Sequence, residues 1–370
     1  MYLHGRPLRI HNQGALNSQR FTTGICLCQR RDDIHMNIKE PIDFVVTWVD
    51  GADPHWRAER QQYSSEPVSD NREVWYRDWE LLRYWFRGVE KFAPWVRTVH
   101  FVTWGHLPSW LNVDNPRLHI VNHRDYIPQE CLPTFNSNAI EMSFHKIEGL
   151  SAQFVYFNDD MFCLKPLTAE YFFRNVKPCD MLAFQPIVAN KEDSTMPHML
   201  LNNSLVLAKY FDKRQNIKQQ PGAYFKLGYP LLYFGYNLLE LAFPQFTGFY
   251  TVHGPFPLCT QAYRDLWSKE EQILYETMSS KFRSRENVTI YLFREWQKLT
   301  GNFTPKNVHS ELAYFNIGER YDKMLKTITK QKRKFICIND GNKPIDFDRT
   351  KSEIQHAFEQ ILPKQSSFEK

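Results

Sequence analysis

Two adjacent carboxylates, Asp159 and Asp160, could bind a metal ion. They follow the short apolar run Phe154–Phe157, which predicts a buried strand. Carboxylates at a strand end suit a hard divalent cation, Mg²⁺ or Mn²⁺, that bridges the phosphates of a nucleotide. A simple turn is the other interpretation, because Asn and Asp are frequent turn residues and Asn158 precedes the pair.

A second candidate carboxylate, Glu141, lies in a segment whose periodicity predicts a helix over 138–148. Glu141, His145 and Glu148 share one face of that helix, opposite an apolar face. The pattern fits a catalytic carboxylate, a solvated polar stripe, or a capping box in which Glu141 reaches back to Asn138. The spacing alone leaves these three interpretations open.

Further along the chain, one histidine and one arginine could act on a phosphate. His253 precedes Gly254 and is either a functional imidazole or a structural residue of a turn. Arg283 and Arg285 precede a predicted helix over 286–299. A guanidinium offers a bidentate fork for phosphate, although a solvated basic turn has the same sequence. No Gly-rich phosphate loop and no G-x-S-x-G motif occurs, which disfavours ATPases, dehydrogenases and α/β-hydrolases.

These candidates must be positioned by the strands and helices around them. Strands are predicted over 42–49, 98–103, 117–121, 154–157 and 334–338, and a further helix over 78–92. This alternation predicts an α/β, Rossmann-like fold with a mostly parallel sheet and helices on both faces. Ligands of such sheets bind beyond the carboxyl ends of the strands, where Asp50 and Asp160 fall.

Composition excludes several classes of protein. The chain has 370 residues, of which 42% are apolar, too many for a disordered scaffold. The net charge of +5 comes from the ends, because residues 1–40 carry a net +3, residues 320–370 a net +5 and residues 41–319 a net −3. An acidic centre argues against nucleic-acid binding. No charge-free stretch is long enough for a membrane-spanning helix.

Taken together, the segments resemble the Stealth family of sugar-1-phosphate transferases, which act in bacterial capsule and exopolysaccharide synthesis and include the lysosomal N-acetylglucosamine-1-phosphotransferase. Four blocks carry the resemblance. They are Ile42–Gly51; the stretch from Arg77-Asp78 through Pro108-Ser-Trp-Leu111, Ala139-Ile-Glu141 and Asn158-Asp-Asp160; Val252-His253 followed by Arg283; and Ile336-Cys-Ile-Asn-Asp340.

The resemblance implies catalytic roles for four residues: Glu141, Asp160, His253 and Arg283. Our hypothesis adds a donor pocket for a nucleotide-sugar, formed by Thr47, Trp48, Val49, Asp50, Arg77 and Asp78, and a Mg²⁺ or Mn²⁺ site at Asp159 and Asp160. Asn136-Ser137-Asn138 departs from the family's usual Ser-Ser-Pro, which puts the identity of sugar and acceptor in doubt.

The implied reaction moves a sugar-1-phosphate from a nucleotide-sugar, expected to be a UDP-sugar, to a hydroxyl of a glycan acceptor. UMP leaves, and either His253 or Glu141 takes the acceptor proton. An ordinary metal-dependent glycosyltransferase would release the nucleoside diphosphate instead. A non-catalytic carbohydrate-binding protein would need no metal.

The sequence divides into three expected segments. Residues 1–40 are expected to be a basic tail with an alternative start at Met36, residues 41–341 the catalytic domain, and residues 342–370 a charged tail. An inserted helical, aromatic-rich subdomain is expected over about 185–250. Within 224–258 a core-packing helix pair is preferred to a segment lying on a membrane, because Glu240 and prolines interrupt the apolar face. We expect a cytoplasmic protein whose basic ends are solvated or touch an anionic membrane.

Overall fold

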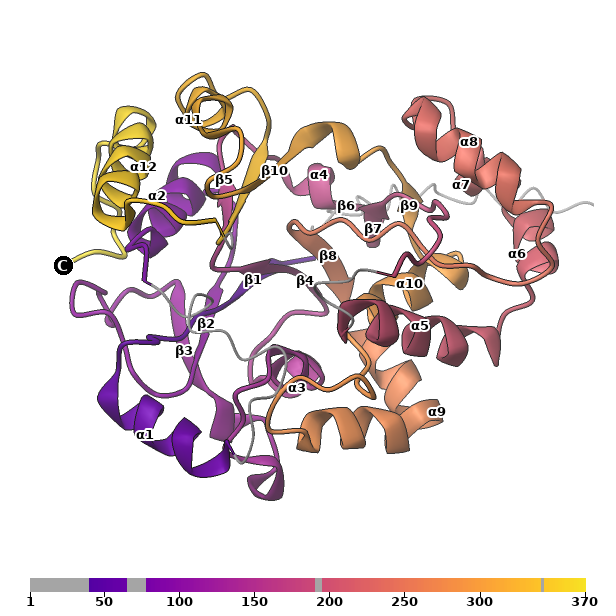
Figure 1. The fold of residues 1–370 in the computed structure, drawn as a ribbon, viewed down its shortest axis with the longest axis horizontal. Helices are drawn as coiled ribbons and strands as arrows, with labels where there is room; N and C mark the ends of the chain where they lie inside the picture. Colours follow the sequence, from indigo (N-terminus) through magenta and orange to yellow (C-terminus); the bar gives the residue numbers. More distant parts are fainter. Residues whose placement is uncertain (1–39, 65–77, 190–194, 341–342) are drawn as a thin grey trace, which may run out of the picture. The chain divides into compact units, whose positions relative to one another are not determined.

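A five-stranded sheet lies at the centre of the computed structural model, which describes residues 40–64, 78–189, 195–340 and 343–370 (Figure 1). Its strand order is β3-β2-β1-β4-β8. The strands are β1 (Ile42–Thr47), β2 (Val99–Thr103), β3 (Leu118–Asn122), β4 (Gln153–Asn158) and β8 (Phe256–Cys259). The first four run parallel, and β8 pairs antiparallel with β4. The predicted α/β fold with a mostly parallel sheet is confirmed.

Helices cover both faces of this sheet. The helices are α1 (Pro54–Tyr63), α2 (Leu82–Phe92), α3 (Ser137–Glu141), α4 (Ala169–Phe172), α5 (Thr195–Ala208), α6 (Lys213–Gln219), α7 (Pro221–Tyr224), α8 (Leu231–Glu240), α9 (Thr260–Ser279), α10 (Tyr291–Leu299), α11 (Tyr321–Thr329) and α12 (Phe347–Ile361). On one face Phe44 packs in the same core as Trp85 of α2. On the other, Val45 shares a core with Tyr263 of α9 and Phe293 of α10. Alternate residues of one strand thus bury on opposite faces, as expected for a covered sheet.

Two small three-stranded sheets flank the central one. One has the order β10-β11-β5 and the other β6-β7-β9. Their strands are β5 (Met161–Cys163), β6 (Phe173–Arg174), β7 (Lys177–Asp180), β9 (Thr304–Pro305), β10 (Leu312–Asn316) and β11 (Phe335–Asn339). The predicted strand over 334–338 corresponds to β11, which pairs antiparallel with β5. This pairing brings the fourth sequence block beside the end of β4.

The predicted helix over 138–148 is wrong in length. Helix α3 ends at Glu141, and a short 3-10 turn follows over Phe144–Lys146. The helix also begins earlier than the predicted capping box requires, because the side chain of Asn136 accepts a hydrogen bond from the backbone N–H of Asn138. Asn138 therefore lies inside the helix and does not cap it.

The expectation of a charged tail over 342–370 is also wrong. Helix α12 buries Ile354 and Phe358 in the core that contains α2, and Phe368 after it is fully buried. Arg87 of α2 donates two hydrogen bonds of 2.9 Å to the carboxylate of Glu369. The charged face of α12 had suggested solvent exposure, but its apolar stripe at a spacing of three to four residues anchors it.

Residues 40–370 form one compact unit, and residues 1–39, on which the expected basic tail falls, lie outside the described residues. The expected N-terminal tail therefore stays a prediction. The segment between β7 and β8 contains the four helices α5 to α8 and is rich in aromatic side chains, as expected. Whether it forms a separate subdomain also stays a prediction.

Candidate active site

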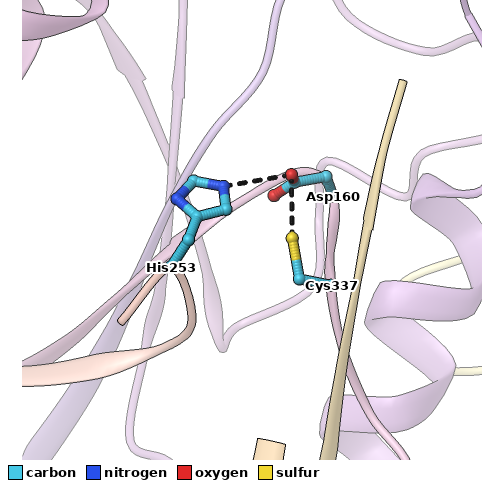
Figure 2. A group of neighbouring side chains, drawn as sticks. All are labelled: Asp160, His253 and Cys337. Atoms are coloured by element: carbon cyan, nitrogen blue, oxygen red, sulfur yellow. Dashed lines mark hydrogen bonds and ion pairs between the residues drawn. The ribbon is translucent and has the colours of Figure 1, made fainter. Parts of the chain in front are cut away.

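Asp160, His253 and Cys337 meet just beyond the carboxyl end of β4 (Figure 2). Oδ2 of Asp160 lies 3.2 Å from Nε2 of His253 and accepts a hydrogen bond of 3.1 Å from the Cys337 thiol. The three ligand atoms all lie within 4.8 Å of one another. A carboxylate, an imidazole and a thiol from three distant parts of the chain thus converge on one point.

The surrounding backbone fixes each of these side chains. Asp160 sits in the turn from β4 to β5, where its carbonyl accepts a hydrogen bond of 2.9 Å from the backbone N–H of Ile338. His253 lies on the loop before β8. Arg294 of α10 donates a hydrogen bond of 3.3 Å to the carbonyl of Val252, and Oη of Tyr291 lies 3.5 Å from Nδ1 of His253. The loop therefore takes its position from α10.

A buried ion pair holds Arg294 in place. Its Nη2 donates a hydrogen bond of 2.6 Å to Oδ1 of Asp180 in β7, and its Nε bonds the other oxygen. Burial opposes ionisation of Asp180, but the cations of Arg294 and Lys298 outweigh it and lower the pKa of Asp180. This planar, two-point pairing ties the His253 loop to a rigid part of the core.

Charge balance sets the protonation of His253. Burial lowers the pKa of the imidazole, but the carboxylate of Asp160 has the opposite effect and the net result is a raised pKa. Burial, followed by the charge of Asp160, raises the pKa of the Cys337 thiol, so the thiol stays protonated and donates to Asp160. An imidazole that is oriented by a carboxylate is the arrangement a general base requires.

Two oxygens beside this cluster have no hydrogen-bond partner within the described part of the chain. They are Oδ1 of Asn158 and Oδ1 of Asp160, both shielded from solvent. Between them in sequence stands Asp159, which is exposed at the surface. Although Asp159 is exposed, the protein atoms around it and then the charge of Asp160 raise its pKa. Unpaired oxygens and crowded carboxylates are the environment that a hard divalent cation satisfies.

Glu141 lies in the interior and not on a solvated face. Only 5% of it is exposed, and its Oε1 accepts a hydrogen bond of 2.8 Å from Oη of Tyr156. Oη of Tyr156 also lies 3.1 Å from the hydroxyl of Thr47 at the end of β1. Burial raises the pKa of Glu141 to about 7, against the opposing effects of Tyr156, Arg283 and His253. The interpretations of Glu141 as a surface stripe or a capping residue are therefore wrong.

Arg283 approaches from the loop after α9. Its Nη2 donates a hydrogen bond of 2.8 Å to the hydroxyl of Ser137 at the start of α3. The charge of Arg283 lowers the pKa of both Glu141 and His253, so it lies within electrostatic reach of both. The structure thus brings together Glu141, Asp160, His253 and Arg283, which come from separate parts of the sequence.

The expected donor-pocket residues follow β1. The ring of Trp48 stacks on Phe101 at 5.7 Å, and the backbone N–H of Asp50 donates a hydrogen bond of 2.7 Å to Nε2 of His106. Asp78 raises the pKa of Asp159, and Asp50 raises that of Asp78, so each of these carboxylates lies within electrostatic reach of the next. Val49 is partly exposed beside Trp48. Arg77 lies outside the described residues.

Sequence reasoning missed Tyr156, Cys337 and Tyr291. Tyr156 belongs to the apolar run of β4, so its hydroxyl was the only feature that could have marked it as a site residue. Cys337 was part of the fourth block but had no assigned role, because its nearness to Asp160 depends on the pairing of β11 with β5. Tyr291 opens α10 and gave no signal of its own.

Comparison with known proteins adds the following. The model described as Stealth protein CR1, conserved region 1, matches residues 40–66, and Stealth protein CR2, conserved region 2, matches residues 75–180. A capsular polysaccharide phosphotransferase WcwK of Streptococcus pneumoniae is 38% identical over 338 residues, which cover 89% of this chain and 99% of that protein. The exopolysaccharide phosphotransferase cps2G of Lactiplantibacillus plantarum is 37% identical over 89% of this chain and 96% of its own length.

The matches to solved structures are more distant. An active-site mutant of LgtC has 10% sequence identity and a TM-score of 0.35, with 85% of this chain and 95% of that chain covered. The bifunctional glycosyltransferase WbbM has 9% identity and a TM-score of 0.34, with 88% of this chain and 52% of that chain covered.

Proposed function

Because the chain belongs to the Stealth family, with relatives named as polysaccharide phosphotransferases at 34–39% identity over most of its length, we propose the following reaction for it. The protein is a transferase of sugar phosphate in capsular or exopolysaccharide synthesis. In the finer proposal, a UDP-sugar donates sugar-1-phosphate to a hydroxyl of a glycan acceptor. The observation that carries the proposal is the Asp160–His253 pair beside two unpaired buried oxygens.

The bond changes are these. The acceptor oxygen attacks the phosphorus next to the sugar, and the bond from that phosphorus to the bridging oxygen of the diphosphate breaks. A phosphodiester forms between sugar and acceptor, and UMP leaves with the bridging oxygen. Such transfers depend mainly on positioning and on neutralising charge.

His253 is the proposed general base. With its Nε2–H directed at Oδ2 of Asp160, the imidazole keeps a lone pair on Nδ1. In the proposal the acceptor hydroxyl takes the place of the long 3.5 Å contact from Oη of Tyr291 to Nδ1, and Nδ1 accepts its proton. The carboxylate of Asp160 stabilises the imidazolium that results. Glu141 points instead into the buried pair with Tyr156, and its proposed role is to balance the charge of Arg283 and hold the wall of the site.

Arg283 is proposed to neutralise the phosphoryl oxygens in the transition state. Its guanidinium is steadied by Ser137 and lies within electrostatic reach of His253. Donors aimed at developing charge in a shielded site contribute several kcal/mol to catalysis, commonly about 3 kcal/mol each. Trp48, Thr47, Val49, Asp50 and Asp78 would line the nucleotide pocket.

Asn158, Asp159 and Asp160 fit a divalent cation, Mg²⁺ or Mn²⁺, because two of their oxygens lack partners and the third residue carries an exposed carboxylate. A bound cation would neutralise the diphosphate of the donor. Oδ1 of Asp160 is available to it while Oδ2 stays with His253, so one carboxylate can serve both groups.

The test is to incubate the protein with UDP-sugars, a capsular oligosaccharide acceptor and Mg²⁺, and to separate the nucleotide products. We expect UMP to form only with acceptor, and a His253→Asn variant to lose that product while it still binds donor. Release of UDP instead would show an ordinary glycosyltransferase. If the protein binds the oligosaccharide without a UDP-sugar and forms no nucleotide product, it is a carbohydrate-binding protein.

A further inference from the structure

Helix α8 exposes its apolar face to solvent. Leu231, Leu232, Leu238 and Leu239 are 88%, 58%, 51% and 66% exposed. Their spacing of seven and eight residues places them on one side of the helix. Leu227 before the helix is 93% exposed, and Phe243 after it is also exposed. We call these six exposed apolar side chains, which all fall within residues 227–243, the leucine face.

The buried side of α8 carries Tyr233, which packs in a small aromatic cluster, and two polar residues, Asn237 and Glu240. Asn237 is fully buried, where its Oδ1 accepts a hydrogen bond of 2.7 Å from the backbone N–H of Phe184 and its Nδ2 donates one of 2.6 Å to the carbonyl of Tyr224. Glu240 forms a buried ion pair with Lys213 of α6. Lys213 donates a further hydrogen bond of 2.9 Å to the carbonyl of Gln245.

These contacts fix the rotation of α8 about its axis. Turning the leucines inward would pull Asn237, Glu240 and Lys213 out of a satisfied network and leave buried polar groups unpaired, which is strongly unfavourable. The expectation that Glu240 interrupts the apolar face is therefore wrong, because Glu240 points into the protein. The helix is held so that its leucines stay outside.

Exposed cations lie on the segments next to α8, because Lys226 precedes Leu227 and because Arg214 and Lys218 belong to α6, whose Lys213 pairs with Glu240. Arg214, Lys218 and Lys226 are exposed, and no ion pair to them occurs among residues 40–64, 78–189, 195–340 and 343–370. On the acidic side, Glu240 is paired and buried, and Asp212 caps α6 by accepting a hydrogen bond from the backbone N–H of Gln215. Leucines flanked by unpaired cations match a bilayer with anionic headgroups. A second copy of this chain would bring like charges together.

We propose that the leucine face lies on an anionic phospholipid surface, with the leucines among the acyl chains and the cations at the headgroups. No helix of the described residues is long and apolar enough to cross a bilayer, so this attachment would be peripheral. The proposed surface differs from the chain ends, of which the C-terminal one is packed in the core. The inference does not depend on the proposed reaction.

The experiment is co-sedimentation of the full chain with vesicles of phosphatidylcholine alone and of equal parts phosphatidylcholine and phosphatidylglycerol. We expect binding to the anionic vesicles that falls by roughly tenfold or more in a Leu231→Ser/Leu239→Ser variant. A Lys218→Glu/Lys226→Glu variant should also bind less, and more salt should weaken the wild type. Leu107→Ser/Val113→Ser, which alters two exposed apolar residues between β2 and β3, is the matched control and should bind like the wild type.

Circular dichroism and thermal melting check that the variants fold, which is expected because the changed side chains are exposed. Equal vesicle binding by the wild type and the double leucine variant would overturn the proposal. So would a wild type that stays unbound and forms, by light scattering, a dimer that the leucine substitutions dissociate. In that case the occupant of the leucine face would be a second copy.

Discussion

Replacing Glu141 by glutamine should stabilise the protein at alkaline pH while it impairs catalysis. Burial raises the pKa of Glu141 from 4.5 to about 7, so the folded state resists its ionisation. The folded state then binds more protons than the unfolded state between these two values, and the free energy of unfolding falls as pH rises through that window. The full difference of about 2.5 pKa units corresponds to about 3 kcal/mol above pH 7.

The Glu141→Gln side chain carries no charge, and its amide oxygen can still accept the hydrogen bond from Tyr156. Urea unfolding of both proteins at pH 4.5 and pH 8 measures the effect. We expect similar stabilities at the acidic pH and an advantage for Glu141→Gln of up to about 3 kcal/mol at pH 8, with loss of transferase activity. An advantage that is independent of pH, or a variant less stable at pH 8, would refute the assignment of an unfavourably buried carboxylate.

Three further predictions concern the phosphate, the cation and the C-terminal helix. Arg283→Ala should lower turnover by about 10²-fold or more, and Ser137→Ala far less; an Arg283→Ala enzyme with normal turnover would exclude its role on transition-state charge. Chelation should abolish turnover in the wild type, with recovery on Mg²⁺ or Mn²⁺, whereas Asp160→Asn should not recover; full activity in chelator would contradict the cation site. Deleting 343–370 should unfold the protein, because the buried Ile354 and Phe358 contribute about 2 kcal/mol each; a cooperative melt at the normal temperature would argue otherwise.

The sequence predicts the central strands well because their residues are apolar in short runs. The strands that end at Thr47 and Asn158 could be predicted without knowing what packs against them, since a strand buried on both faces is apolar along its whole length. Asp160 could be proposed from its place after such a run. His253 was also proposed, but its contact with Asp160 and that of Cys337 could not be predicted, because they depend on the loop that α10 holds and on the pairing of β11 with β5.

The sequence could not show which way a polar residue points, so a solvated stripe stayed open for Glu141 beside a catalytic role, and Glu240 was expected to interrupt an apolar face. Glu141 and Glu240 are both buried, one against Tyr156 and the other against Lys213. Periodicity gives the angle between side chains on a helix but not which side faces the core. The partner that pairs with a buried charge is distant in sequence. The local sequence pattern of a helix is therefore the same whether its polar residue faces the core or the solvent. The same ambiguity concealed the leucine face of α8.

The central claim is that the bond is made to phosphorus and not to the sugar carbon. A UDP-sugar with radioactive phosphorus at the phosphate next to the sugar tests this directly, with the acceptor glycan isolated after reaction. The account predicts that the label appears in the glycan, in a linkage that phosphodiesterase cleaves, and that the released UMP is unlabelled. Sugar incorporated into the glycan without label, together with labelled UDP, would contradict it.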